Sequence, residues 1–409
     1  MSSTACDLLQ SLVRIPSVNE RGNTANAKLE SAAPEAGVTR FLRRHFEARG
    51  WSWLTQRTAD GAENLVALAP GGGGDLLLLE AHQDTIGVEG MRIDPFAAKV
   101  EGGRVWGRGA CDVKGGMAAV LAAADRLAGG PVADRPRLLL AFTVNEEAGF
   151  TGVRALARIW EDGEEAALRV DESGGLSAGW LAEHKPSAAV VMEPTGLDVV
   201  VAHKGTVRWK CEAIGRAAHS SDPSAGANAV YAIARVIAAV ESYHREVLAG
   251  LEGHPLCGGP TVCVTTVAGG VAVNAVPDRA AIDIDRRLQP GEEADAAREE
   301  LIRFIRRRVG ETDCRIEHDE AWMSSVGLPD ALNGELAGRV SAAAQAEGAA
   351  GRVVGAPYGT NAFALAAAGI PTVVFGPGSI EQAHTDDEWI SIDELDRAVR
   401  VLCRLAGGA

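Results

Sequence analysis

Four short and almost continuous apolar runs limit the folds that this chain can adopt. They occupy residues 76–81, 137–144, 188–192 and 372–375, with the sequences LLLLEA, RLLLAFTV, AAVVM and TVVF. A strand that is covered by helices on both faces is apolar at nearly every position, whereas a half-exposed strand alternates between apolar and polar residues. The runs therefore predict a mostly parallel sheet.

Helical patterns separate these runs. The Ala- and Leu-rich segment 114–128 stops at Gly129 and Gly130, and glycine commonly ends a helix. A last helix is expected to open at Ser391, because Ser391 and Glu394 have the spacing of a capping box. Strands that alternate with helices indicate an α/β domain.

The middle third of the chain has a different pattern. Segment 206–215 alternates in polarity, as a half-exposed antiparallel strand does. Two helices and three further strands are expected in the order β-α-β-β-α-β, the split ferredoxin-like arrangement, at 227–248, 261–268, 279–286, 292–309 and 315–318. We therefore predict an inserted α+β domain at 202–320, between two parts of an α/β catalytic domain at 1–201 and 321–409.

Composition excludes several classes of function. The net charge of −15 argues against binding to nucleic acids or to anionic membranes, because both require clustered Lys and Arg. The N-terminal stretch is too polar for a signal peptide, and no apolar run reaches the length of a membrane span. Seven scattered cysteines without a C-x-x-C pair indicate reduced thiols. We expect a cytoplasmic protein.

Potential metal ligands follow every apolar run. Ligands of α/β sheets bind beyond the carboxyl ends of the strands. The side chains expected there, or just before the Ala-rich helix, are His82, Asp84, Asp112, Glu146, Glu147, Glu193 and His384. Imidazole and carboxylate together suit zinc and similar metals, and a carboxylate such as Asp112 can bridge two ions. Asp84 is placed to accept the ring N–H of His82.

The adjacent pair Glu146 and Glu147 fits this interpretation. Neighbouring side chains on an extended segment point in opposite directions, so the two glutamates can perform different tasks. One can bind a metal, and the other can stand away from it and accept a proton.

In these motifs the chain resembles the two-zinc amidohydrolase family of acetylornithine deacetylase, succinyl-diaminopimelate desuccinylase, aminoacylase and glutamate carboxypeptidase. The similar segments are AHQDT, GRGACDVKGG, TVNEEAG, VMEPT, RAAHSSDPSAGANAV, GGVAVNAVPD, DRRLQPGE and FGPGSIEQAHTDDE. The resemblance implies two Zn²⁺ per subunit, with Co²⁺ or Mn²⁺ as substitutes. It implies His82 and Glu193 on one ion, Glu147 and His384 on the other, and Asp112 between them, followed by a cis peptide at 112–113.

The same resemblance implies roles for further residues. Glu146 is the expected general base and acid, and His219 is expected to stabilise the oxyanion in the partner subunit. The inserted domain is expected to act as a lid and to form a homodimer. Expected substrate-binding residues are Asn274, Arg287 (with Arg286 as the neighbouring alternative), Gly359 and Thr360. Asn361 departs from the family pattern, which has Asp there, and its role stays open.

The predicted reaction is hydrolysis of the amide bond of an N-acyl amino acid, as in acetylornithine deacetylase. A dipeptidase or carboxypeptidase of the same fold is the alternative, because the acyl group and the peptide are alike at the bond that breaks. A binding protein without metal is a further alternative, against which the intact ligand set argues. The serine-hydrolase pattern GLSAG at 175–179 lacks a preceding apolar strand, and GRGACD lacks the last glycine of a dinucleotide-binding motif.

Overall fold

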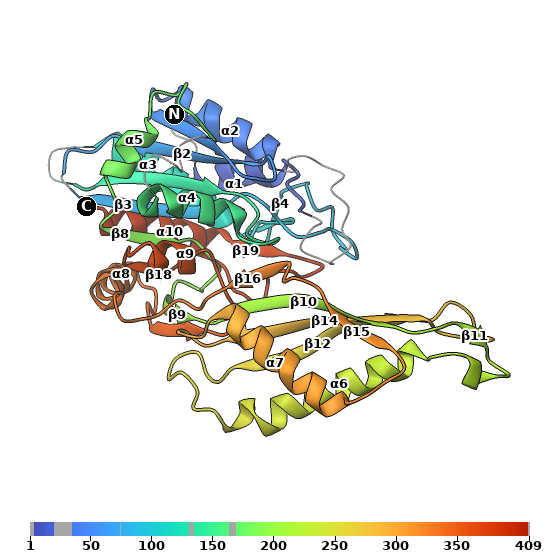
Figure 1. The fold of residues 1–409 in the computed structure, drawn as a ribbon. Coiled ribbons are helices and arrows are strands. Elements are labelled where there is room, and N and C mark those ends of the chain that lie inside the picture. The colour runs from blue at the N-terminus through green and yellow to red at the C-terminus, as the bar shows by residue number, and fades with distance from the viewer. Residues whose placement is uncertain (1–3, 20–34, 74, 131–134, 163–168, 408–409) are drawn as a thin grey trace. The chain divides into compact units, whose positions relative to one another are not determined.

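The computed structural model describes residues 4–19, 35–73, 75–130, 135–162 and 169–407, and the chain divides into two compact units. The first unit comprises residues 1–201, 330–354 and 360–409, and the second comprises 202–329 and 355–359. Figure 1 colours both units along the chain. The second unit thus continues beyond residue 320, the limit predicted for the inserted domain, and it includes the short return segment 355–359.

The first unit is built on a nine-stranded sheet. Its strand order is β17 (Val353–Ala356), β9 (Val199–His203), β18 (Thr372–Val374), β8 (Ala188–Val191), β3 (Leu76–His82), β6 (Arg137–Thr143), β2 (Glu63–Ala69), β1 (Ser52–Arg57), β7 (Val170–Asp171). The four apolar runs form the central strands β18, β8, β3 and β6, which are mutually parallel.

The sheet as a whole is mixed, so the prediction of a mostly parallel sheet is correct only for its centre. Strands β2, β1 and β7 continue the sheet in antiparallel fashion beyond β6, and β9 pairs antiparallel with β18. The link from β1 to β2 spans only residues 58–62. A connection this short joins antiparallel strands, whereas a parallel pair requires a crossover of a dozen or more residues.

Helices cover both faces of the sheet. One face packs against α1 (Ala5–Val13), α2 (Ala36–Glu47), α3 (Lys114–Ala128), α8 (Gly334–Ala346) and α10 (Ile392–Leu405) in a single apolar core. Helices α4 (Thr151–Glu161), α5 (Ala178–Glu183) and α9 (Ala362–Ala367) pack together with strands of the sheet on the other side. Among the described residues, no helix combines the length and apolar character that a membrane span requires.

Helix α3 is the Ala-rich segment, and nearly all of it is buried. A helix that is apolar on every side lies inside a protein, and its small alanines let α1 and α10 pack closely against it. Its C-cap is Gly129, as the sequence predicts. Helix α10 begins after Ser391, whose hydroxyl accepts a hydrogen bond from the Glu394 N–H.

The second unit has the predicted split β-α-β-β-α-β order. Its elements are β10 (Gly205–Ile214), α6 (Ala229–Glu246), β12 (Thr261–Gly269), β14 (Arg279–Leu288), α7 (Ala294–Val309) and β15 (Arg315–His318). The antiparallel strands lie in the order β12-β14-β10-β15, and β16 (Met323–Ser325) also pairs with β10. Figure 1 shows α6 and α7 on one face of this sheet.

The alternating sequence of β10 explains that arrangement. Its buried residues Val207, Trp209 and Cys211 belong to the same core as the apolar residues of α6 and α7, such as Ile233 and Leu301. Every second side chain of a strand points to the same face, so the intervening residues of β10 lie on the opposite face of the sheet. The sequence pattern of this unit therefore determined both the strands and the side that the helices cover.

Replacing Leu140 with Ala should lower the free energy of unfolding by about 2–5 kcal/mol. Leu140 is fully buried at the centre of β6, between Leu79 of β3 and Ala67 of β2, so truncation leaves a cavity that the sheet cannot close. Urea denaturation followed by circular dichroism measures the change. The matched control is Leu332→Ala, a residue that is 60% exposed, for which a change within about 0.5 kcal/mol is expected. Equal losses in the two variants would contradict this account of the core.

Candidate active site

His82 is the last residue of β3, and a backbone oxygen fixes the orientation of its ring. The side chain is 1% exposed, and Nδ1 lies 2.9 Å from the backbone oxygen of Asp84. The sequence predicted that Asp84 orients this ring, but the Asp84 carboxylate is farther away, at 3.5 Å. The main chain of Asp84 is therefore the nearer acceptor. This contact leaves Nε2 of His82 directed toward Asp112, 3.0 Å from Oδ1.

The Asp84 carboxylate instead organises the loop that follows β6. Its two oxygens accept the backbone N–H groups of Glu146 and Glu147, at 3.1 and 3.2 Å, and the side-chain amide of Asn19 at 3.0 Å. Asn145 begins the turn with a φ of 60°, a left-handed conformation that asparagine tolerates better than most residues. One buried carboxylate thus fixes the main chain of both glutamates.

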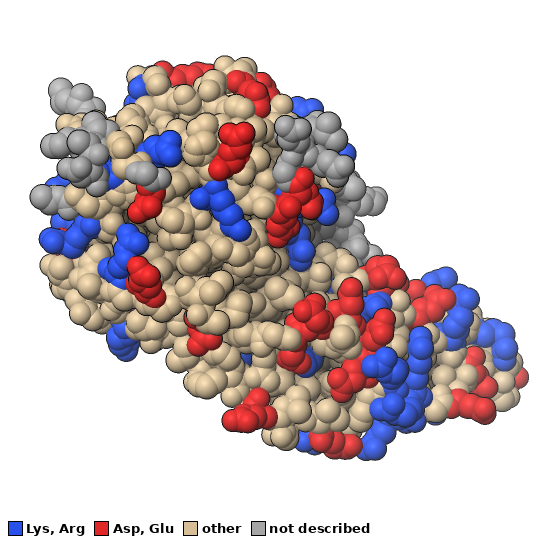
Figure 2. All heavy atoms as spheres, turned by 60° about the vertical axis from the view of Figure 1, so that its left-hand side comes forward, with Lys and Arg blue, Asp and Glu red and all other residues tan. Residues whose placement is uncertain are grey.

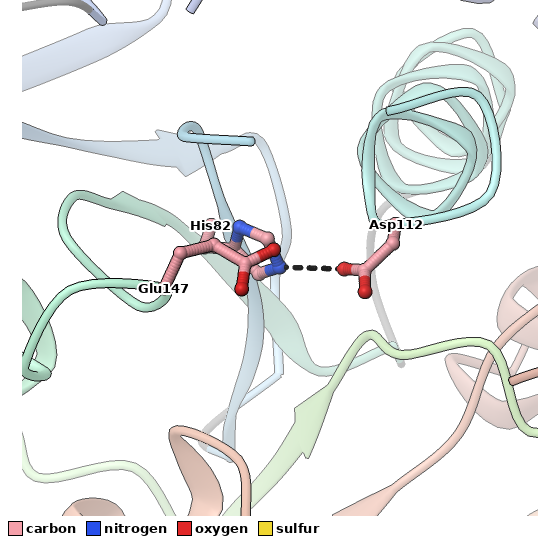
Figure 3. A group of neighbouring side chains, drawn as sticks. All are labelled: His82, Asp112 and Glu147. Atoms are coloured by element: carbon pink, nitrogen blue, oxygen red, sulfur yellow. Dashed lines mark hydrogen bonds and ion pairs between the residues drawn. The ribbon is translucent and has the colours of Figure 1, made fainter. Parts of the chain in front are cut away.

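Asp112 precedes α3 and faces both histidines. Its Oδ1 lies 3.0 Å from Nε2 of His82, and its Oδ2 lies 3.3 Å from Nε2 of His384. Figure 3 shows the first of these contacts, with the Glu147 carboxylate beside it. The peptide between Asp112 and Val113 is cis, as the sequence resemblance implied. A carboxylate that directs one oxygen to each of two histidines has the form of a bridge.

Glu147, Glu193 and His384 complete two groups of potential ligands. Glu147 Oε1 lies 3.1 Å from His384 Nε2, and Glu193 Oε1 lies 4.0 Å from His82 Nε2. One ligand atom each of His82, Asp112 and Glu147 lies within 4.8 Å of the others. All five side chains come from the first unit, at the carboxyl ends of its central strands and in the loops beside them.

The electrostatics of this cluster favour a cation. Burial, together with neighbouring acids, raises the pKa of Glu146 and of Glu193 well above the usual value and also raises the pKa of Glu147. Burial opposes the charge of Asp112 and of His384. Even so, their mutual contacts hold the pKa of Asp112 well below its usual range, and contacts with Asp112 and Glu147 raise that of His384 to about 11. Protonated histidines therefore balance the negative charge of the neighbouring carboxylates, and a metal ion could supply this positive charge in place of the protons.

Glu146 differs from its neighbour. Among the described residues, the structure records no hydrogen bond to its carboxylate, whereas that of Glu147 contacts His384. The nearby charges that affect it are those of His82, Glu147, Asp112 and Asp84, so it belongs to the same cluster. A half-buried carboxyl group that is free of a fixed partner and holds its proton tightly can both accept and donate a proton.

His219 and Asn274 lie side by side in the second unit. Strand β11 (Ala218–His219) pairs with β13 (Ala275–Val276), so that His219 is opposite Ala275. The N–H of Ser220 donates to the backbone oxygen of Asn274 at 3.0 Å. The His219 side chain is exposed, and its Nδ1 lies 2.7 Å from the hydroxyl of Ser221.

The alternation of β14 separates Arg286 from Arg287. Arg286 is 1% exposed and makes an ion pair with Glu292 at 2.7 Å. The Arg287 side chain is on the other face, is 26% exposed and contacts Asp285 at 2.9 Å. Gly359 lies beside Lys204 in the second unit, since a Cβ there would be 3.1 Å from the Lys204 backbone oxygen. Thr360 opens the next segment of the first unit and is buried.

Asn361, whose role was open, makes its side-chain contacts inside the first unit. It is fully buried, and its side-chain amide donates to Glu80 Oε1 and Thr143 Oγ1, both at 3.0 Å. Glu80 in turn is the one acidic residue inside the LLLLEA run, and burial raises its pKa to about 7. An aspartate at 361 would face this buried carboxyl group, so asparagine is the compatible partner. The polar residue within an apolar run was the sequence signal for this contact.

Glu388 is a residue of the candidate site that the sequence did not predict. It is fully buried, and its carboxylate accepts hydrogen bonds from the segment that carries Asp112. Glu388 is the last residue of the segment FGPGSIEQAHTDDE, but nothing in that segment distinguishes it from the neighbouring acids, and only the folded chain brings it to Asp112.

The chain is similar over most of its length to known proteins. Residues 78–407 match the model of a family described as Peptidase family M20/M25/M40. The chain is 29% identical over 385 residues to acetylornithine deacetylase of Myxococcus xanthus, covering 91% of this chain and 92% of that protein. It is 28% identical over 428 residues to a probable carboxypeptidase of Aspergillus niger, covering 98% of this chain and 90% of that protein.

A solved structure shares the fold. The M20 family metallo-carboxypeptidase from Sulfolobus solfataricus has a TM-score of 0.75 at 17% identity, with 99% of each chain covered. The match to the family covers most of the residues, including the whole cluster of histidines and carboxylates from His82 to His384. The chain therefore belongs to peptidase family M20/M25/M40 and is a metal-dependent amidohydrolase.

Proposed function

We propose that this protein hydrolyses the amide bond of an N-acyl amino acid with the help of two divalent metal ions, zinc or a substitute such as cobalt or manganese. The observation that carries the proposal is the position of Asp112, whose two oxygens face His82 and His384. Glu193 lies on the His82 side and Glu147 on the His384 side. Each metal would thus have one imidazole, one terminal carboxylate and a share of Asp112.

The donor set fits zinc. Zinc in hydrolases binds imidazole nitrogen and carboxylate oxygen and keeps a position open for water or substrate. A pair of such ions polarises the carbonyl group of the substrate and makes water more acidic. The raised pKa values of Glu146, Glu147 and Glu193 also favour positive charge at this place, which two divalent ions would supply.

Glu146 is proposed to move the proton. Its backbone is fixed by Asp84, so its carboxyl group stays beside the cluster without occupying a ligand position. It accepts a proton from the attacking water and later donates one to the departing amine. A raised pKa suits this alternation, because the group must hold a proton between the two steps.

Residues of the second unit are proposed to bind the substrate. The exposed imidazole of His219 can donate a hydrogen bond to the oxyanion, and Asn274 lies next to it. Arg287 is better suited than Arg286 to hold a substrate carboxylate, because Arg286 is buried and paired with Glu292. Gly359, and Thr360 of the first unit, are also proposed to contact the substrate.

We also propose a homodimer that forms through the second unit. Strand β12 is at an edge of its sheet, and most of its residues are exposed. Val267 on this strand and Val271 and Val273 just beyond it are 67%, 92% and 100% exposed. Within the described part of the chain, β12 pairs on one side only, and an edge strand beside exposed apolar side chains is a surface that proteins usually cover.

The proposed reaction is tested with purified protein and three classes of substrate: N-acetyl amino acids, N-succinyl amino acids and dipeptides. We expect the highest kcat/KM for an N-acyl amino acid in the presence of added zinc or cobalt, and loss of activity after chelation. A preference for dipeptides would favour the alternative peptidase function, for which the carboxypeptidase relative is an argument. Full activity after removal of all metal would contradict the mechanism.

Glu146→Gln should lower kcat about 10²–10⁴-fold, the contribution typical of general acid–base catalysis. Because Glu146 is proposed to carry protons and not to bind metal, the variant should retain two ions per chain by elemental analysis. Glu147→Ala is the matched control, and it should lose one ion. If Glu146→Gln loses metal and Glu147→Ala keeps it, the two roles are reversed.

His219→Ala and Glu146→Gln should complement each other if His219 acts in the site of the partner subunit. A mixed dimer then has one site that lacks both groups and one site that is intact. After co-refolding of the two inactive variants, we expect activity to return to half of the wild-type value per mixed dimer. Verified subunit exchange without recovered activity would rule out action in the partner's site.

A further inference from the structure

The Glu388 carboxylate accepts four hydrogen bonds from one short segment of the chain. Oε1 accepts from the backbone N–H groups of Cys111 at 2.7 Å and Asp112 at 2.9 Å. Oε2 accepts from the Gly109 N–H at 2.9 Å and from the Arg108 guanidinium at 2.8 Å. Glu388 is fully buried, so water does not compete with these donors for the carboxylate.

The main chain reinforces the same connection. The Glu388 backbone oxygen accepts from the Gly107 N–H at 3.0 Å. Strand β19 (Trp389–Ser391) follows Glu388 directly and pairs with β5 (Arg104–Trp106), which leads into the Asp112 segment. Segments 104–112 and 388–391 therefore form a continuous ladder, which ends at the carboxylate of Glu388.

This ladder joins two of the residues that face each other in the candidate active site. His384 is four residues before Glu388 in the chain, and the backbone N–H of Asp112 donates a hydrogen bond to the Glu388 carboxylate. The His384 side chain is about half exposed, and its ring contacts Asp112 and Glu147. The distance between His384 and Asp112 thus depends on how firmly the two segments are tied together.

We infer that Glu388 is a positioning residue, whose carboxylate holds the Asp112 segment against the His384 segment so that Asp112 can bridge two metal ions. This inference rests on the proposed two-metal function. Glu388 does not touch the substrate or the metals in this assignment. It acts through the backbone of Asp112, and its contribution is to metal affinity, above all on the His384 side, where the ligand is least buried.

The donors around Glu388 make the carboxylate difficult to replace. Glutamine has the same shape, but one of its two terminal atoms is an NH₂ group that can only donate. In one orientation this group faces the N–H groups of Cys111 and Asp112. In the other orientation it faces Gly109 N–H and Arg108, so two donors lose their acceptor either way. Buried donors without an acceptor destabilise the local structure.

The test is the metal affinity of Glu388→Gln, measured by competition with a chromophoric zinc chelator and by elemental analysis. We expect two ions per chain in the wild type, and in the variant at least a tenfold increase in the dissociation constant of the weaker ion. Raising the zinc concentration should restore kcat, because the catalytic groups themselves are unchanged. Glu388→Asp keeps the charge but has a shorter side chain, so its metal affinity should lie between those of the wild type and Glu388→Gln. This variant provides the test if Glu388→Gln does not fold.

Asp125→Asn is the matched control. Asp125 is also a buried acceptor for an arginine, Arg49, but it lies at the other end of α3 from Asp112. This variant should lose thermal stability and keep the metal affinity of the wild type. The inference is overturned if Glu388→Gln binds both ions as tightly as the wild type, or if Asp125→Asn weakens them equally. A wild-type protein that fails to bind two ions would instead refute the proposed function.

Discussion

Hydrogen bonds from backbone N–H groups to two buried carboxylates hold the candidate active site together. Asp84 accepts from Glu146 and Glu147, and Glu388 accepts from the segment that ends at Asp112. A hydrogen bond to a charged group contributes about 1.5–3 kcal/mol, more than one between neutral groups. These two acids therefore fix the main chain from which three of the proposed metal and proton-transfer residues extend.

This support is needed because the fold concentrates negative charge. The central strands are parallel, so the acids that follow them meet at one edge of the sheet. Burial raises the pKa of Glu146, Glu147 and Glu193, a sign that their joint ionisation is unfavourable without a counter-charge. His82 and His384 supply positive charge when protonated, and two metal ions would supply more. Family membership, the donor types and this electrostatic requirement all lead to the same metal-dependent chemistry.

The second unit contributes a surface of a different kind. Its sheet is covered by α6 and α7 on one face, and the strand alternation places Arg286 in the buried interior and Arg287 on the opposite face. The pairing of β11 with β13 brings His219 next to Asn274, although the two residues are far apart in the chain. The exposure of His219 and Arg287 is compatible with the proposed substrate-binding role. Both residues are far in sequence from the carboxylates because they belong to the second unit.

The sequence by itself determined the central strands, the split order of the second unit and the residue types of the proposed metal site. Continuous apolar runs, alternating polarity and acids at strand ends are local patterns, and each depends on only a few neighbouring residues. These patterns did not predict the antiparallel flank of the sheet, because the direction in which two strands pair is not encoded in the apolar pattern of either strand. The contacts of the Asp84 and Glu388 carboxylates were decided by tertiary structure alone. Each binds groups that are distant in the chain, and an acid that accepts backbone N–H groups leaves no periodic signal in the sequence.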